Sequence, residues 1–347
     1  MSSHSTFGDI LLRKREIEGK LEEFQRTFIA GNRTQDLARE EEQLLMKLET
    51  CREQEEILWR KKSRVQWLKE GERNTKFFHR AMTHQRHINR ISQLEDEQGV
   101  PIKEHDKIEE ALNTFYQDLL TETNTSRGEA IQKVTRHIPR LINSEQNNAL
   151  MRPITQAEVD LVVKDMPSGK APGPDGFTTD FFHHCWDMVK VDVWLAIEEY
   201  RTSGQVLSAL NATFITLIPK EERATHPKEF RPISLCNVIY KIITKTIANR
   251  LKPLLPLIIS KEQSGYVEGR QIMDSVLLAN EVIHSLKTSK TPGMLIKIDL
   301  SKAFGRLSWH YLWSVLESFG FSNVWVDWIL KLTTSSFFSI LVNGTPS

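Results

Sequence analysis

Met294-Leu-Ile-Lys-Ile298 is followed directly by Asp299-Leu-Ser-Lys-Ala-Phe304. The first five residues form an apolar run of the length of a short strand, and the aspartate stands where that strand would end. We therefore expect a strand at 294–298 that carries a carboxylate at its end, a position suited to a hard cation that prefers oxygen ligands. By pattern alone, an aspartate in this position is more often a capping or solvated residue.

Two amphipathic helices and a hairpin are expected downstream of this run. Apolar residues recur at helical spacing in both helices, first at Leu312, Val315, Leu316 and Phe319, and then at Trp325, Trp328, Ile329 and Leu332. Residues 337–342 read as a strand, and Asn343-Gly344 is a strong hairpin turn. Since only three residues remain for the returning strand, we expect the chain to stop in the middle of a fold.

Upstream, residues 212–218 predict a short strand that is followed by a polar loop to Phe230. Ser234 then predicts the cap of a helix. The apolar residues of that helix, which are expected to face the protein core, are Leu235, Ile239, Ile242, Ile243 and Ile247. Its basic residues, which are expected to stay solvated, are Lys241, Lys245 and Arg250.

Thr155 predicts the cap of an earlier helix, which ends in the Pro- and Gly-rich loop 167–176. Gly169-Lys170 in that loop is no phosphate-binding P-loop, because the spacing to the preceding glycine and the following Ser or Thr is wrong. His183, His184 and Cys185 resemble metal ligands by type only, since neighbouring residues on a helix point in different directions. We expect them to be structural.

The first third of the chain reads as helix, with a break at Gly31-Asn32 that predicts two helices. The positions that recur at seven-residue intervals are Leu37, Leu44, Cys51, Leu58 and Val65. A helix that packs on its own protein is the simpler interpretation, and a coiled-coil homodimer through this N-terminal helix is the alternative.

Basic and aromatic residues are concentrated between positions 59 and 90, with ten Lys or Arg against two Glu. Lysine and arginine can neutralise phosphates while aromatic rings stack on bases. The alternative is a solvated helix face with its aromatic rings in the core. The residues predicted to bind nucleic acid here are Arg60, Lys61, Lys62, Arg64, Arg73 and Lys76, together with Lys241 and Lys245 downstream.

The composition indicates a folded chain. Of 347 residues, 39% are hydrophobic, and 46 basic residues nearly balance 45 acidic ones, so any nucleic-acid signal must be local. No apolar stretch approaches the roughly 18 residues of a membrane span, and the first ten residues do not read as a signal peptide. The three cysteines form no disulfide framework. We expect an intracellular protein, nuclear or cytoplasmic, that is neither secreted nor embedded in a membrane.

From about Ser63 to Ser347 the chain resembles the reverse transcriptase region of plant LINE-type (non-LTR) retrotransposons. The resemblance is carried by six strings in family order. They are Ser63-Arg-Val-Gln-Trp-Leu-Lys-Glu-Gly with Arg73-Asn-Thr-Lys-Phe-Phe-His79, Ser168-Gly-Lys-Ala-Pro-Gly-Pro-Asp-Gly176, Leu217-Ile-Pro-Lys220, Phe230-Arg-Pro-Ile-Ser-Leu-Cys-Asn237, Gln263-Ser-Gly-Tyr-Val-Glu-Gly-Arg-Gln271 and Lys297-Ile-Asp-Leu-Ser-Lys-Ala-Phe304.

The resemblance implies an RNA-directed DNA polymerase that extends a primer by two-metal phosphoryl transfer. It implies that Asp299, with the carbonyl of Leu300 beside it, holds catalytic Mg²⁺. Lys220 and Arg231 match positions that grip the triphosphate of the incoming nucleotide, and Phe304 matches the steric gate against its 2′-hydroxyl. The implied partners are an RNA template, a DNA primer or RNA–DNA hybrid, and deoxynucleoside triphosphates.

Two departures from the family pattern change this expectation. No Asp-Asp dipeptide occurs in the 347 residues, so the acidic pair of the next palm hairpin is absent. A single carboxylate does not hold two divalent ions, and we expect the chain to be inactive alone. The aspartate usual six positions after the metal-binding one is Gly305 here.

The fold class expected from these observations is α+β, with a helical N-terminal extension followed by the fingers and a partial palm of a right-hand polymerase. The expected parts are 1–62 as a helical or coiled-coil extension, 63–150 as a basic, aromatic helical linker, 151–292 as fingers and 293–347 as an incomplete palm. The alternative functions are a non-catalytic nucleic-acid-binding module and a helical interaction protein.

Overall fold

A computed structural model of the protein describes residues 3–29, 35–63, 75–96, 98–121, 127–289, 292–300 and 303–347. The chain forms two compact units, Met1–Arg90 and Ile91–Ser347, and each is described by itself. Among the described residues, no helix combines the length and the apolar character needed to span a membrane. Helices and strands are both present, which is consistent with the α+β class.

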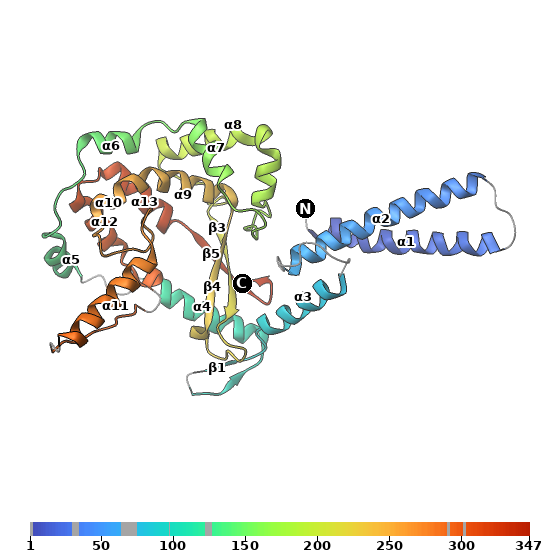
Figure 1. Ribbon diagram of the computed structural model, residues 1–347, viewed down its shortest axis with the longest axis horizontal. Helices are drawn as coiled ribbons and strands as arrows, with labels where there is room; N and C mark the ends of the chain where they lie inside the picture. The colour runs from blue at the N-terminus through green and yellow to red at the C-terminus, as the bar shows by residue number, and fades with distance from the viewer. Residues whose placement is uncertain are drawn as a thin grey trace. The chain divides into compact units, whose positions relative to one another are not determined.

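The first unit is built from the helices α1 (Ser3–Ile29), α2 (Gln35–Ser63) and α3 (Thr75–Asn89) (Figure 1). α1 and α2 pack against each other as an antiparallel hairpin, and Lys14 Nζ donates to Glu55 Oε2 at 2.7 Å between them. The apolar side chains buried in these two helices are Ile10, Leu21, Leu48, Cys51 and Leu58. The predicted division into two helices is confirmed, and α2 packs on its own chain.

A helical layer supplies the larger core of the second unit. Its largest fully buried side chains include Trp325, Tyr200 and Ile197. Tyr200 donates its hydroxyl to the Trp328 carbonyl at 2.7 Å. The helices of this layer are α6 (Ser144–Met151), α7 (Gln156–Lys164), α8 (Thr179–Ser203), α9 (Val238–Leu251), α10 (Leu255–Ile258), α12 (Trp309–Phe319) and α13 (Asn323–Thr334). The two helices predicted from the apolar spacing at 312–319 and at 325–332 are confirmed as α12 and α13.

A four-stranded sheet has the order β4-β3-β5-β6. The central strand β3 (Ala212–Pro219) runs antiparallel to β4 (Phe230–Cys236) and parallel to β5 (Phe337–Val342). The helix α4 (His105–Leu120) packs on one face of the sheet. This second core contains Ile108, Leu112, Tyr116, Ile215, Leu217, Phe230, Ile340 and Val342. The strands predicted at 212–218 and 337–342 are confirmed.

The predicted Asn343-Gly344 turn is also confirmed. Both residues have positive φ, 56° and 95°, as a tight hairpin turn requires. The turn connects β5 to β6 (Thr345–Pro346). The Asn343 side chain exchanges hydrogen bonds with the backbone of Ile91, which fixes the turn to the start of this unit. A second small hairpin pairs β1 (Leu94–Glu95) with β2 (Pro101–Ile102).

The predicted helix cap at Ser234 is wrong. Ser234 lies in β4, where it pairs with Ile215 of β3, and α9 begins at Val238. Seven residues of β4 are paired with β3, and this tertiary pairing overrides the local helical pattern. The helical pattern itself holds from α9 onward, since Ile242, Ile243 and Ile247 are buried.

The strand expected at 294–298 is not formed either. Residues 292–300 have no regular structure, and the side chains of Met294, Leu295, Ile296 and Ile298 are 65–82% exposed. A strand needs a neighbour to satisfy its backbone N–H and C=O groups. None of the described strands pairs with this segment, so its apolar character alone does not make it a strand.

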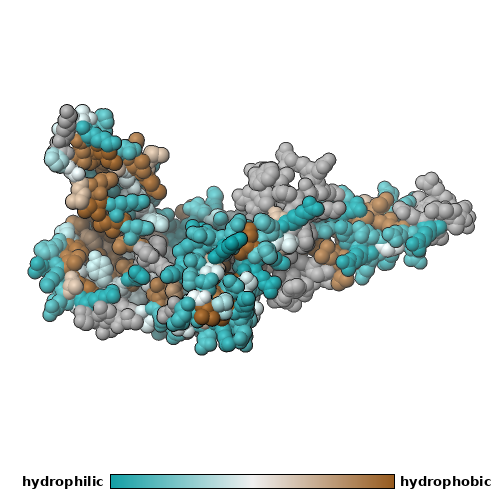
Figure 2. All heavy atoms as spheres, turned by 90° about the horizontal axis from the view of Figure 1, so that it is seen from below, coloured by the Kyte–Doolittle hydropathy of each residue, from teal (hydrophilic) through white to brown (hydrophobic). Residues whose placement is uncertain are grey.

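Exposed apolar residues continue on α11 (Ile272–Thr288), which precedes this segment and buries none of its side chains. Figure 2 shows apolar side chains gathered at the left of the view, where α11 lies. The most exposed of them are Ile272, Met273, Leu277 and Leu278, at 54–72%. After the segment, the short helix η3 (Ala303–Arg306) leads into α12.

Candidate functional site

The loop end of the β3–β4 hairpin brings two predicted site residues together. Arg231 pairs with Ile218 across the ladder, and Pro219 pairs with Phe230. The Lys220 N–H continues the pairing by donating to the Glu229 carbonyl at 2.9 Å. Because side chains alternate along strands, Lys220 and Arg231 share the face opposite the one packed on α4.

Both cations are accessible to a ligand. The Arg231 and Lys220 side chains are exposed, and Lys220 Nζ donates to the Lys228 carbonyl at 2.8 Å. The acceptor of that bond is a neutral oxygen, and no ion pair among the described residues involves Lys220. An ammonium and a guanidinium on one strand face suit an anion with several oxygens, such as a polyphosphate.

Asn237 is a structural residue of this region that the sequence patterns did not reveal. It is 1% exposed, and Nδ2 donates to the carbonyls of Ala209 and Leu210 at 3.0 and 3.2 Å. Oδ1 accepts from the Asp175 N–H at 3.1 Å. A Cβ on Gly173 would lie 2.4 Å from the Asn237 backbone nitrogen, so only glycine permits this approach. The loop 167–176 is therefore fixed to the start of α9.

Lys241 and Lys245 lie one turn apart on α9 and are each partly exposed. Burial raises the pKa of the Asp175 carboxyl, while the bond from the Phe177 N–H and the charge of Lys241 oppose that rise. The Asp175 carboxylate of the loop thus lies within electrostatic range of Lys241. The loop 167–176 therefore lies next to the part of α9 that carries Lys241.

Asp299, the residue expected to bind a metal ion, does not lie at the end of a strand. Asp299 and Leu300 belong to the irregular segment 292–300, and Leu300 is 74% exposed. No hydrogen bond or ion pair among the described residues joins Asp299 to Lys220 or Arg231. Phe304 lies on η3, but its side chain is outside the described part of the structure.

The basic segment of the first unit is described only in part. Arg60, Lys61 and Lys62 lie at the end of α2 and Lys76 at the start of α3, and nothing is described of their side chains. Arg64 and Arg73 lie outside the described residues.

His183 and His184 make structural hydrogen bonds. His183 Nε2 lies 2.8 Å from the Val163 carbonyl and Nδ1 lies 3.3 Å from Ser168 Oγ, so the ring joins α7, α8 and the loop. His184 Nδ1 lies 2.7 Å from the Asp180 carbonyl within α8. In the described part of the chain, no group of three His, Cys, Asp or Glu residues has the arrangement of a metal site.

Comparison with known proteins identifies residues 218–347 as a match to the family described as reverse transcriptase (RNA-dependent DNA polymerase). The chain is 28% identical over 282 residues to the transposon TX1 uncharacterized 149 kDa protein of Xenopus laevis, a match that covers 81% of this chain and 21% of that protein.

Two Pol polyproteins of R2 elements are also similar. The retrovirus-related Pol polyprotein from type-1 retrotransposable element R2 of Popillia japonica is 25% identical over 169 residues, which cover 49% of this chain and 23% of that protein. The retrovirus-related Pol polyprotein from type-2 retrotransposable element R2DM of Drosophila melanogaster is 25% identical over 173 residues, or 50% of this chain and 16% of that protein.

The resemblance to the reverse transcriptase of non-LTR retrotransposons is thereby confirmed. The matches span about a fifth of the length of these curated relatives. The family match begins at Ile218, which lies on the hairpin that carries Lys220 and Arg231. It therefore includes the two cations, Asn237, α9 and the segment that contains Asp299.

Proposed function

We propose that this chain, whose residues 218–347 resemble reverse transcriptases, is part of an RNA-directed DNA polymerase of a LINE-type retrotransposon. The observation that carries the proposal is the family match together with the placement of Lys220 and Arg231 on one face of the β3–β4 hairpin. In this proposal, residues 151–292 contribute the fingers and residues 293–347 part of the palm, after a helical extension at 1–62 and a linker at 63–150.

The proposed role of Lys220 and Arg231 is to hold the triphosphate of the incoming deoxynucleotide. A guanidinium offers paired donors to two phosphate oxygens, and an ammonium adds a compact charge. To bind, Lys220 Nζ must leave the Lys228 carbonyl. Because that bond is to a neutral acceptor at an exposed site, its exchange for a phosphate oxygen is favourable. The proposed role of Phe304 is to exclude nucleotides that carry a 2′-hydroxyl.

Reverse transcriptases in general use divalent metal ions, but the described residues do not fit a complete site for them. Magnesium in such enzymes is held by carboxylates together with substrate phosphates. Asp299 supplies one carboxylate and Leu300 one carbonyl, and no described group of three acidic, His or Cys residues completes a set. We therefore assign no step to a metal ion here.

Nucleotide binding tests the proposed role of the hairpin. A fluorescent deoxynucleoside triphosphate is titrated into the 347-residue protein with and without Mg²⁺. Lys220→Ala and Arg231→Ala are each expected to weaken binding about tenfold, the effect of one charge-assisted hydrogen bond of roughly 1.5 kcal/mol. Lys228→Ala is the matched control, because it removes a neighbouring lysine charge and retains the backbone carbonyl that accepts from Lys220. Equal affinities for all four proteins would refute the assignment.

Primer extension tests the polymerase itself. Since no Asp-Asp dipeptide is present, the 347-residue polypeptide is expected not to extend an RNA-templated primer with Mg²⁺ or Mn²⁺. Template-dependent incorporation that Asp299→Asn abolishes would show that these residues suffice for catalysis, against this expectation.

The second candidate function is nucleic-acid binding without chemistry. It is supported by the basic segment 59–90 and by Lys241 and Lys245 on α9, which suit an RNA template or an RNA–DNA hybrid. Replacing Arg60, Lys61, Lys62 and Arg64 by alanine is expected to flatten the salt dependence of RNA affinity. An unchanged salt dependence would remove this segment from the binding surface. The homodimer through the N-terminal helix stays a prediction.

A further inference from the structure

The loop that joins β3 to β4, residues 220–229, is bonded to the hairpin of β1 and β2 (Figure 1). The Glu95 N–H donates to the Thr225 carbonyl at 2.9 Å, and Glu95 Oε2 lies 3.5 Å from His226 Nε2. Glu95 faces Pro101 in the β1–β2 ladder. The Glu95 N–H therefore serves the loop and not the neighbouring strand β2.

Glu229 joins the two ends of the 220–229 loop. It is the last residue of the short helix η1 (Pro227–Glu229), and its Oε2 accepts from the N–H groups of Thr225 and His226 at 2.8 and 3.1 Å. Its carbonyl accepts from the Lys220 N–H at 2.9 Å. The bonds from His226 and Thr225 hold the pKa of the Glu229 carboxyl below its ordinary value. Both bonds are therefore made to an ionised carboxylate at neutral pH, which strengthens them.

A continuous series of hydrogen bonds thus leads from β1 to Lys220. It passes from the Glu95 N–H to Thr225, from the Thr225 N–H to the Glu229 side chain, and from the Glu229 carbonyl to the Lys220 N–H. The Lys220 ammonium is in turn bonded to the carbonyl of Lys228, the residue before Glu229. The position of the ammonium therefore depends on the conformation of the whole loop.

The β1–β2 hairpin is itself fixed to the core of the second unit. Leu94 of β1 is 0% exposed and belongs to the same buried cluster as Phe230, the first residue of β4. Ala224 of the loop packs on that cluster as well. Within the hairpin turn, Asp96 Oδ1 accepts from the Val100 N–H at 2.7 Å. The hairpin and the loop thus share one buried support.

The backbone bond carries the larger part of the connection between the hairpin and the loop. The Glu95 and His226 side chains are 32% and 36% exposed, and an exposed pair at 3.5 Å is screened by solvent. The bond from the Glu95 N–H, at 2.9 Å, has the ordinary length of an N–H···O bond. Removing this N–H is therefore the change that releases the loop from β1.

We propose that the β1–β2 hairpin positions Lys220 for its ligand by holding the 220–229 loop, with Glu95 and Glu229 as positioning residues. The ligand is the nucleotide triphosphate of the proposed function, on which this inference rests. The hairpin lies at residues 94–102, before the family match begins at Ile218. A segment outside the matched residues thus determines part of the affinity of a site inside them.

Two substitutions of Glu95 separate its backbone bond from its side chain. Glu95→Ala removes the carboxylate, and Glu95→Pro removes both the carboxylate and the N–H. Proline is compatible with this position, because β2 does not use the Glu95 N–H and strand edges tolerate proline. Glu281→Ala is the control for the loss of a carboxylate, since Glu281 is exposed on α11. Thermal melts of each variant verify folding.

The experiment measures two quantities on the 347-residue protein. One is the rate of tryptic cleavage after Lys220 and Arg223 without ligand, and the other is the affinity for a fluorescent deoxynucleoside triphosphate. Glu95→Pro is expected to speed cleavage and to weaken nucleotide binding about threefold to fivefold, in the range of one intramolecular hydrogen bond. Glu95→Ala is expected to weaken binding less than about twofold, and Glu281→Ala is expected to change neither quantity.

The same substitution in the Lys220→Ala background distinguishes positioning from a general structural role. There, Glu95→Pro is expected to speed cleavage after Arg223 without weakening nucleotide binding further, because the residue that it positions is absent. An equal loss of affinity in both backgrounds would overturn the proposal. So would an unchanged affinity of Glu95→Pro in the presence of Lys220.

Glu229 supplies a second pair of variants should Glu95→Pro not fold. Glu229→Ala removes the acceptor of the Thr225 and His226 N–H groups and is expected to weaken binding like Glu95→Pro, whereas Glu229→Gln retains an accepting oxygen and is expected to restore it. Equal affinities of these two variants would contradict the proposal. Equal binding by the wild-type protein and Lys220→Ala would refute the proposed function and the positioning with it. A loss in Lys220→Ala alone would refute only the role of the hairpin.

Discussion

Replacing Arg250 by methionine removes the side chain that joins α9 to the turn between α6 and α7. Arg250 is 5% exposed at its side chain, and Nε and Nη2 donate to the two Glu158 carboxylate oxygens at 3.0 Å each. The same guanidinium donates to the carbonyls of Leu150, Arg152 and Pro153. Five hydrogen bonds thus depend on one residue, and methionine preserves only its apolar stem.

The expected cost follows from the groups left without a donor. Removing one member of a buried, hydrogen-bonded ion pair costs about 3–5 kcal/mol. The Glu158 side chain is 23% exposed, so water restores part of its solvation. We therefore expect Arg250→Met to lower the free energy of unfolding by about 2–4 kcal/mol.

Urea unfolding followed by tryptophan fluorescence measures this loss, because most tryptophans of the chain lie in the second unit. Arg152→Met is the matched control, since Arg152 contacts the same carboxylate at 3.3 Å but is 60% exposed at its side chain. An exposed pair contributes no more than about 1 kcal/mol. If both variants shift the unfolding midpoint equally, burial does not determine the strength of this contact and the reasoning fails.

Two further outcomes are expected in the same unit. Burial alone would raise the pKa of Glu158, but bonds from Arg250 and Thr155 outweigh it and hold the pKa at about 2, below the ordinary value of 4.5. The stability from this depressed pKa is present above about pH 4.5 and is lost as the pH falls toward 2, so Glu158→Gln should flatten the pH dependence of unfolding in that window. Asn237→Ala should cost about 2–4 kcal/mol, because each buried group left unpaired costs about 1–3 kcal/mol, and should speed tryptic cleavage at Lys170. Cleavage at the wild-type rate would show that Asn237 does not hold the loop.

The elements that the sequence predicts correctly depend on short-range signals. Thr155 and Glu158 form the capping box that begins α7, and both lie within four residues of chain. The helical spacing of Trp325 and Trp328 places them in the core, and Asn343-Gly344 gives its turn without help from distant residues. In these cases local preference and tertiary packing favour the same structure.

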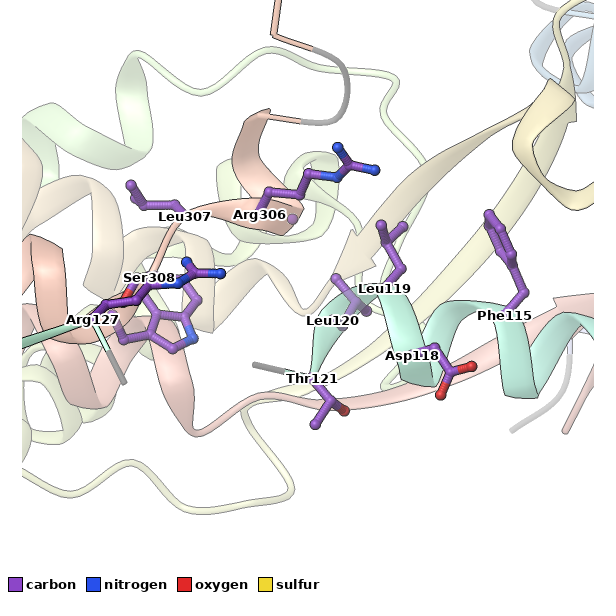
Figure 3. Close-up of a pocket in the computed structure, with 11 residues that line it drawn as sticks. Phe115, Asp118, Leu119, Leu120, Thr121, Arg127, Arg306, Leu307 and Ser308 are labelled. Carbon is purple, nitrogen blue, oxygen red and sulfur yellow. The ribbon is translucent and has the colours of Figure 1, made fainter. Parts of the chain in front are cut away.

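The errors and omissions involve partners that are distant in sequence. The local pattern predicts a helix that begins at Ser234, because neighbouring residues carry no sign of its pairing with Ile215 in the sheet. Arg250 reads as a solvated position on α9, yet its partner Glu158 lies 92 residues earlier and makes it one of the least exposed cations described. The pocket between the C-terminal end of α4 and the connection from η3 to α12 (Figure 3) likewise depends on the packing of η3 against α4, which no periodicity indicates.

The position of Asp299 connects the fold to the proposed chemistry. A metal ligand acts only when its carboxylate is held within about 0.5 Å of the productive position, by packing and by neighbouring hydrogen bonds. Residues 292–300 have neither strand partners nor buried side chains among the described residues, and the adjoining α11 exposes its apolar residues as well. No hydrogen bond or ion pair between described residues holds the Asp299 carboxylate in such a position. Arg231, in contrast, belongs to a ladder of seven residue pairs, and the Lys220 N–H extends that ladder by donating to the Glu229 carbonyl. In the proposed function the hairpin presents Lys220 and Arg231 to the triphosphate, while catalysis at Asp299 requires a pairing of residues 294–298 that orders the carboxylate.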